Sequence, residues 1–305
     1  MIKIYKTEAR ETKEISKIEE NCWIHVTNPS QAELNHIHEA TKIHMNLLNK
    51  LLDRHETSRI EMRDDATLIV LNTPVKSNHG YKTAPMGIIL SAKYCITITI
   101  DTKAFLERLV TENQINTMEK TNFVIAVFFR TASLYLEYLK NIQTSLEARE
   151  KALYKATSNN ELKGLLEIQK SLVYFLNALN SNEIVLERIM QGKIIPLYEE
   201  DNILLEDTII ENRQAISMTN LYQALVVSLT DSYGTIISNN LNQVMKFLAG
   251  ITIVFSIPTM ISSFMGMNVP LGIFNNSEMA FLTLVALSII ISVVVAWIFK
   301  RKNWL

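Results

Sequence analysis

The chain has 305 residues, with 30 basic and 31 acidic side chains and a formal net charge of −1. This balance excludes the broad basic surface by which nucleic-acid-binding proteins are recognised. The two cysteines, Cys22 and Cys95, fall in a part that we expect to be cytoplasmic, so reduced, structural thiols are predicted there.

Residues 1–121 predict one compact cytoplasmic α/β domain. Stretches rich in β-branched and aromatic residues, bounded by Asn, Pro, Gly or Asp, predict strands. Helices are predicted between them near 30–41 and 45–53, and Ser30 and Glu33 have the spacing of a capping box. The predicted strands are 2–6, 22–26, 59–63, 67–75, 83–91 and 94–100.

Residues 122–245 predict a helical bundle and a stalk helix, because apolar residues recur there at steps of three and four. Gly192 and Pro196 separate the second helix from the third. Beyond residue 199 nothing ends the third helix convincingly before Pro258, since a glycine such as Gly234 costs a helix only about 1 kcal/mol. A helix this long needs neighbours to cover its apolar side, which favours a bundle or an oligomer.

Residues 246–305 predict a transmembrane domain with two helices, at about 247–265 and 279–299. Each apolar stretch is about 20 residues long, the length that crosses a bilayer core. Lys246 precedes the first stretch, Lys or Arg occupies 300–302, and the loop between the stretches has neither. The positive-inside rule therefore places both termini in the cytoplasm of a multi-pass plasma-membrane protein.

Small and polar residues follow one face of the first membrane helix, at alternating steps of three and four. In one interpretation they allow close packing against the second membrane helix. In the other, several copies surround an axis and the residues line a water-filled path. The second membrane helix is predicted to be uniformly apolar, as a lipid-facing outer helix would be. The contrast between the two helices favours the interpretation that the stripe lines a water-filled path. The stripe comprises Asn242, Met245, Ala249, Thr252, Ser256, Thr259 and Ser263.

Three short segments stand out in the last part of the chain. They are Gly266-Met267-Asn268 at the end of the first apolar stretch, NQVMKFL at 242–248 where that stretch begins, and the basic Trp-Leu ending at 300–305. Together they resemble the CorA family of divalent cation channels, because the tripeptide matches the family's Gly-Met-Asn motif in place and spacing and the other two are similar to the start of its pore helix and to its C-terminal ending. The order of domains is also similar over the whole chain.

The chain departs from the family pattern at three points. Met265 takes the place of the usual aromatic residue before the motif. The proline of the pore helix, Pro258, is displaced by one position. The acidic loop that follows the motif in many members is reduced to Glu278.

The resemblance implies a homopentamer in which five copies of Asn268 surround the outer mouth of a pore. Neutral amide oxygens suit a hydrated Mg²⁺, which sheds its waters reluctantly, and bind it weakly enough for release. Gly266 would permit a tight reversal with close approach of subunits, and Met267 would pack beneath the ring. Met245 and Leu248 resemble the hydrophobic constriction of the family, although ordinary helix packing is the other interpretation.

The resemblance further implies closure of the channel by cytoplasmic Mg²⁺ that carboxylates bind between neighbouring subunits. Asp207 falls where the family has a regulatory Asp on the stalk helix. Its partner is left open among Asp64, Asp65 and Asp101. The acidic run at 199–201 is explained more simply by the dipole of a helix that starts there.

The leading hypothesis is therefore a Mg²⁺ uptake channel driven by membrane potential, with Co²⁺ and Ni²⁺ as further candidate ions. A Zn²⁺ transporter of the ZntB-like branch is the nearest rival, and Met267 favours Mg²⁺ modestly. A membrane-anchored sensor or scaffold is the alternative from another class. We expect no enzyme, since the sequence has no nucleophile–base pattern and no phosphate-binding loop. His36 and His38, two residues apart on a predicted helix, are poorly spaced for joint metal binding.

Overall fold

The computed structural model of the chain describes residues 1–8, 11–54, 56–63, 66–100, 115–153, 160–267, 280–302 and 304. The chain divides into two compact units, Met1–Thr230 and Asp231–Leu305. The division lies inside one helix, α6, which extends from Glu199 to Met265. The long third helix that the sequence predicts is thus confirmed.

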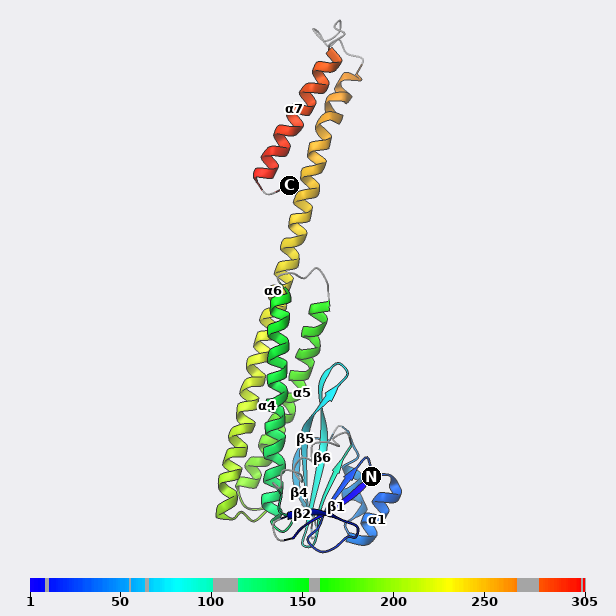
Figure 1. Ribbon diagram of the computed structural model, residues 1–305, viewed down its shortest axis with the longest axis vertical. Helices are drawn as coiled ribbons and strands as arrows, with labels where there is room; N and C mark the ends of the chain where they lie inside the picture. Colours follow the sequence, from blue (N-terminus) through cyan, green and yellow to red (C-terminus); the bar gives the residue numbers. More distant parts are fainter. Residues whose placement is uncertain are drawn as a thin grey trace. The chain divides into compact units, whose positions relative to one another are not determined.

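The first unit contains a seven-stranded sheet of order β2-β1-β3-β7-β6-β5-β4 (Figure 1). The pairing of β3 with β7 is parallel, and the other pairings between the described strands are antiparallel. The strands are β1 (Ile2–Glu8), β2 (Glu11–Ile15), β3 (Trp23–Thr27), β4 (Arg59–Arg63), β5 (Ala66–Ser77), β6 (Gly80–Ser91) and β7 (Cys95–Thr99). Six of them coincide with predicted strands. β2 was not predicted, because its sequence, ETKEI, is mostly charged and exposed or half-buried.

Each face of the sheet has its own hydrophobic core, because successive side chains of a strand point to opposite faces. Leu68 belongs to the core under α1 (Gln31–Thr41) and α2 (Met45–Lys50), whereas its neighbour Ile69 belongs to the core under the long helices. The unit therefore has three layers. The predicted capping box is present at the start of α1, where Ser30 caps the helix.

Three long helices cover the second face and form a bundle: α4 (Lys120–Leu153), α5 (Asn160–Met190) and the first part of α6. Apolar residues of all three share one core. Polar contacts add to it, since Asn212 of α6 donates to the Leu179 carbonyl of α5 at 3.1 Å. The helical region predicted from residue 122 is confirmed.

The two cysteines lie in different layers. Cys22 belongs to the core under α1 and α2, and Cys95 to the core under the long helices. Both are free and buried, and burial raises the pKa of both thiols. A buried, protonated thiol is unreactive, which fits the structural role expected for them.

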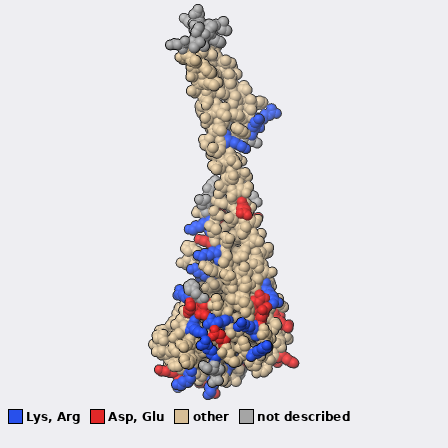
Figure 2. Space-filling view, turned by 180° about the vertical axis from the view of Figure 1, so that it is seen from behind, with Lys and Arg blue, Asp and Glu red and all other residues tan. Residues whose placement is uncertain are grey.

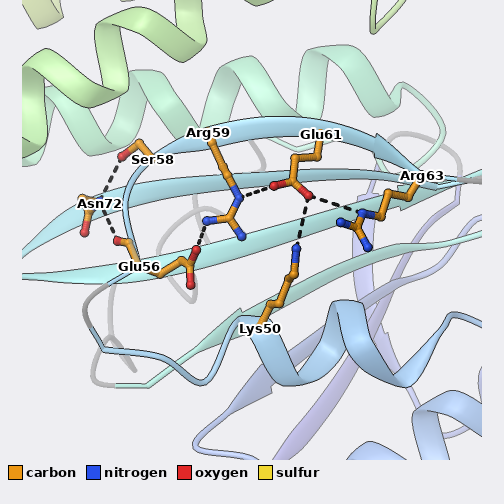
Figure 3. A network of polar contacts seen from close by, with 7 residues as sticks. All are labelled: Lys50, Glu56, Ser58, Arg59, Glu61, Arg63 and Asn72. Carbon is orange, nitrogen blue, oxygen red and sulfur yellow. Dashed lines mark hydrogen bonds and ion pairs between the residues drawn. The ribbon is translucent and has the colours of Figure 1, made fainter.

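A network of charged residues ties the edge strand β4 to α2 (Figure 3). Glu61 lies 2.7 Å from Arg59 Nε, 3.4 Å from Lys50 Nζ and 3.6 Å from Arg63 Nε, while Arg59 also pairs with Glu56. Burial alone would raise the pKa of Glu61, but the charges of Arg59 and Lys50 outweigh it, and the pKa is lowered. Charges on an edge strand also discourage pairing with another sheet.

Asn182 of α5 completes the hydrogen bonding of β5 where β4 no longer reaches. The last pair of β4 with β5 is Arg59 with Val70. Beyond it, the Asn182 side chain accepts from the Asn72 N–H at 2.9 Å and donates to the Asn72 carbonyl at 2.9 Å. Its oxygen also accepts from the Ser58 hydroxyl at 2.7 Å, and the side chain is 1% exposed.

Replacing Asn182 by leucine, which has the same branching at Cγ but no polar atoms, is expected to destabilise the first unit by about 2 kcal/mol. The change leaves the Asn72 N–H without its acceptor, at about 1–3 kcal/mol for a buried unsatisfied group, while the Asn72 carbonyl still accepts from the Tyr135 hydroxyl at 3.0 Å. The measurement is the Tm of the purified full-length protein in detergent. Leucine at the exposed Asn180 of the same helix is the matched control. An equal Tm for both variants would contradict this role.

Candidate ion path in the second unit

The second unit contains the end of α6 and α7 (Ala280–Arg301). Both helices are long and apolar enough to cross a membrane, as predicted, and only 6% of each apolar stretch is buried within the single chain. Figure 2 shows a long tan surface on this unit, with its blue side chains gathered in one place. The surface therefore requires lipid or other copies of the chain to cover it.

The two helices contact each other through small and branched residues. The Ser292 hydroxyl of α7 approaches the Val254 carbonyl oxygen of α6 at 3.5 Å. Ser288, one turn earlier on α7, is buried. These serines correct the reading of the second helix as uniformly apolar, because they form part of the face turned to α6. In the apolar part of α6 beyond Lys246, the more covered residues are Gly250, Ile251, Val254, Ile257, Pro258, Ile261 and Met265.

The polar stripe lies on the opposite face of α6. At about 100° of rotation per residue, Thr252, Ser256 and Thr259 lie roughly half a turn around the helix from Val254 and Ile261. The structure therefore gives no support to packing of the stripe against α7 of the same chain. The candidate path residues are all exposed: Asn242, Met245, Leu248, Thr252, Ser256, Thr259 and Ser263.

A shallow groove follows this stripe, lined by Ile251, Thr252, Phe255, Ser256, Thr259, Met260, Ser263 and Phe264. Its hydroxyls donate back to the helix: Thr252 to the Leu248 carbonyl at 2.8 Å, Ser256 to the Thr252 carbonyl at 2.7 Å, and Thr259 to the Phe255 carbonyl at 3.1 Å. Since each hydroxyl has one hydrogen, its oxygen remains an acceptor. Water molecules around a cation present hydrogens, so such a face suits a hydrated cation.

The motif at the end of α6 is described only in part. The Gly266 N–H donates to the carbonyls of Ser262 at 3.1 Å and Ser263 at 3.2 Å, and Gly266 and Met267 are exposed. A Cβ on Gly266 would lie 3.5 Å from the Ser263 carbonyl oxygen, an ordinary contact. Among the described residues, nothing therefore requires glycine at this position. Asn268 lies outside the described residues, as does Glu278.

Asp207 lies exposed on one side of α6 in the first unit, and large apolar side chains share that side. Ile203, Ile210, Leu221 and Leu225 are 69%, 61%, 57% and 44% exposed. At about 100° per residue they lie within a narrow sector that also includes Asp207. Exposed apolar residues that follow one side of a helix mark a surface that another protein covers.

No cluster of metal ligands surrounds Asp207 in the part of the chain that the structure describes. Among the described residues, no group of three or more His, Cys, Asp or Glu gathers around a possible metal position. Asp64, Asp65 and Asp101 lie outside the described residues. Asp201 is buried and accepts from the Tyr198 N–H at 3.3 Å, which confirms the acidic run as part of the helix start.

Comparison with known proteins agrees with this architecture. A family model described as CorA-like Mg²⁺ transporter protein matches residues 19–301. The cobalt/magnesium transport protein CorA of Methanocaldococcus jannaschii is 26% identical over 293 residues, 93% of this chain and 91% of that one. The complete structure of the CorA magnesium transporter from the same organism matches with a TM-score of 0.85 and 23% identity, covering 100% of this chain and 99% of the other.

A more distant solved structure is the ZntB cytoplasmic domain from Vibrio parahaemolyticus. It matches with a TM-score of 0.61 and 11% identity, covering 78% of this chain and 98% of that one. At such identities, structural matches establish the fold alone. An α/β domain, a long stalk helix and two apolar C-terminal helices are therefore the architecture of this chain.

Proposed function

The chain belongs to the CorA-like Mg²⁺ transporter family, and from this premise we propose that it is a membrane channel for Mg²⁺ uptake that also accepts Co²⁺ and Ni²⁺. The observation that carries the proposal is the stripe of hydroxyls on the face of α6 opposite to α7. Five copies around an axis would turn these oxygens toward a common path, with α7 outside. The relative from Methanocaldococcus jannaschii is named for cobalt and magnesium transport.

The driving force is the membrane potential. A divalent cation that crosses an inside-negative membrane gains roughly 4.6 kcal/mol per 100 mV, which is twice the value for one charge. Transport driven in this way needs no phosphate-binding loop. The stripe also contains no titratable side chain that would couple ion transport to proton movement. The termini would lie in the cytoplasm, on the side of the basic residues 300–302.

Selection would occur at Gly266-Met267-Asn268. Five neutral Asn268 oxygens would hold Mg²⁺ through its water shell. Since the described residues leave room for a Cβ at Gly266, we attribute the glycine to close approach of neighbouring subunits. Met245 and Leu248, both exposed in the single chain, would form an apolar constriction at the inner end of the path.

Closure would depend on Mg²⁺ bound between subunits near Asp207. The apolar side of α6 that carries Asp207 supports this, because a neighbouring copy that covered Ile203 and Ile210 would also meet this carboxylate. A Mg²⁺ that bridges two subunits would stabilise the closed arrangement, and internal Mg²⁺ would then control its own uptake as a linkage effect. The partner carboxylate belongs to the adjacent subunit in this proposal.

Asp207→Ala is expected to raise the internal Mg²⁺ concentration needed for half-closure about tenfold, which corresponds to about 1.4 kcal/mol of lost coupling. The measurement is Mg²⁺ influx into liposomes loaded with graded Mg²⁺. Glu137→Ala, which removes an exposed carboxylate from α4, is the control and should leave half-closure unchanged. Unaltered closure in the Asp207 variant would remove Asp207 from the regulatory site.

The proposed function is tested by flux of Mg²⁺, Co²⁺ and Zn²⁺ into liposomes that contain the purified wild-type protein and hold an inside-negative potential. We expect potential-driven Mg²⁺ influx that Co²⁺ competes for. Zn²⁺ influx that depends on a proton gradient would instead place the protein with Zn²⁺ transporters. Absence of flux from a verified oligomer with low internal Mg²⁺ would favour a membrane-anchored sensor.

A further inference from the structure

Pro258 deprives one carbonyl of α6 of its usual partner. In an α-helix the N–H of residue i donates to the carbonyl of residue i−4, so position 258 should serve the Val254 carbonyl. Proline has no N–H, and Pro258 lies inside the apolar part of α6. In a membrane helix, a carbonyl that proline frees in this way is satisfied by a Ser or Thr side chain, a neighbouring helix, an ordered water or a local change of helix geometry.

The Ser292 hydroxyl of α7 lies within reach of that carbonyl. Its oxygen is 2.8 Å from the Ser288 carbonyl of its own helix and 3.5 Å from the Val254 carbonyl oxygen, so the Ser288 carbonyl is the main acceptor of its hydrogen and the Val254 carbonyl is the weaker, second acceptor. The contact joins the two helices at the carbonyl that proline leaves free. Ser288 is also buried, but its hydroxyl donates to the Val285 carbonyl of α7 at 2.8 Å.

The contact lies directly behind the candidate path. Val254 is half-buried on the face toward α7, whereas Thr252 and Ser256, two residues away on either side, are exposed on the opposite face. Proline weakens the helix at this turn, since the 258-to-254 hydrogen bond is missing. The position of the Thr252 and Ser256 oxygens therefore depends on what holds the Val254 peptide from the other side.

We propose that Ser292 is a positioning residue for the path: it holds the proline-weakened turn of α6 against α7 and thereby sets where Thr252 and Ser256 lie. This inference rests on the proposed function for its effect on transport. The contact itself is independent of transport. The serine and the proline act as a pair, because the serine is needed only while residue 258 has no N–H.

A double-mutant cycle with Ser292→Ala and Pro258→Ala tests the pair. Ser292→Ala alone is expected to lower the maximal Mg²⁺ flux per reconstituted oligomer about threefold and to lower the Tm in detergent. Threefold corresponds to the roughly 0.6 kcal/mol that a hydrogen bond between membrane helices contributes on average. The half-saturating Mg²⁺ concentration should not change, because the contact is remote from the outer motif. In the Pro258→Ala background, where the new alanine N–H can serve the Val254 carbonyl, Ser292→Ala should change neither flux nor Tm.

Ser288→Ala is the matched control, and it should leave maximal flux at the wild-type value. Ser292→Thr, which keeps the hydroxyl, should restore flux and Tm toward wild type. Equal losses from Ser292→Ala in the wild-type and Pro258→Ala backgrounds would overturn the proposal, as would equal losses from Ser288→Ala. If wild-type liposomes show no flux, the proposed function fails, and additive Tm changes in the cycle would separately exclude the Ser292–Val254 contact.

Discussion

Replacing Asn268 by alanine is expected to abolish potential-driven Mg²⁺ influx while the protein still folds and assembles. In the proposed channel, Asn268 supplies the amide oxygens that receive the hydrated ion at the outer mouth. Alanine has no side-chain oxygen, and a Mg²⁺ that approaches from bulk water would find nothing there to replace its outer water shell. The measurement is initial Mg²⁺ influx into liposomes with an imposed inside-negative potential, normalised to oligomer recovered by size-exclusion chromatography.

Asn276→Ala provides a closely matched control for Asn268→Ala. It makes the same chemical change in the same short segment between the two apolar helices. Influx through the Asn276 variant should equal that of wild type, because residue 276 is outside the Gly-Met-Asn motif. Wild-type influx through a folded Asn268 variant would count against a selectivity role for this residue, and equal losses in both variants would point to a general effect of the segment.

A cysteine at position 256 is expected to make the channel sensitive to a small, positively charged methanethiosulfonate reagent, with nearly complete loss of Mg²⁺ influx. Ser256 lies on the exposed face of α6, so five modified cysteines would place positive charge along the proposed path. A single positive charge at about 4 Å from Mg²⁺ in water repels it by about 2 kcal/mol, which alone reduces flux about 30-fold.

The control for Ser256→Cys is Ile257→Cys, one residue further along the same helix. Ile257 is half-buried on the side that faces α7, so its thiol should be protected and the reagent should have no effect on influx. The native Cys22 and Cys95 are both buried, so wild-type protein should also be insensitive. Inhibition of the Ile257 variant with no inhibition of the Ser256 variant would reverse our assignment of the two faces.

The sequence predicts most of the fold because its elements carry strong local patterns. The buried strands β5 and β6 are rich in apolar and β-branched residues, and α6 continues without a convincing break from Glu199. β2 could not be predicted in this way. Its residues are largely charged, and it is held by pairing with β1, for example Ile15 with Ile4, which depends on a partner rather than on its own composition.

The candidate site likewise has features that a local sequence pattern predicts and features that depend on a neighbouring element. The spacing of Thr252, Ser256 and Thr259 predicts that they share one face of a helix, but it leaves open whether this face meets the second membrane helix. Only the packing of α7 on the other side, through Ser288 and Ser292, answers that question for the single chain. Ser292 carries no sequence signal for its contact, since the contact depends on which turn of α7 lies beside Val254.

The hydroxyls of α6 that donate to carbonyls of their own helix affect whether the proposed path would admit cations or anions. Thr252, Ser256 and Thr259 each commit their single hydrogen to a backbone carbonyl. A chloride ion in the groove would therefore meet oxygen lone pairs and no hydrogen-bond donor from these side chains, whereas a cation or its water shell would meet acceptors. The path would exclude anions through the orientation of neutral dipoles, without a charged residue that would bind a divalent cation too tightly to release it.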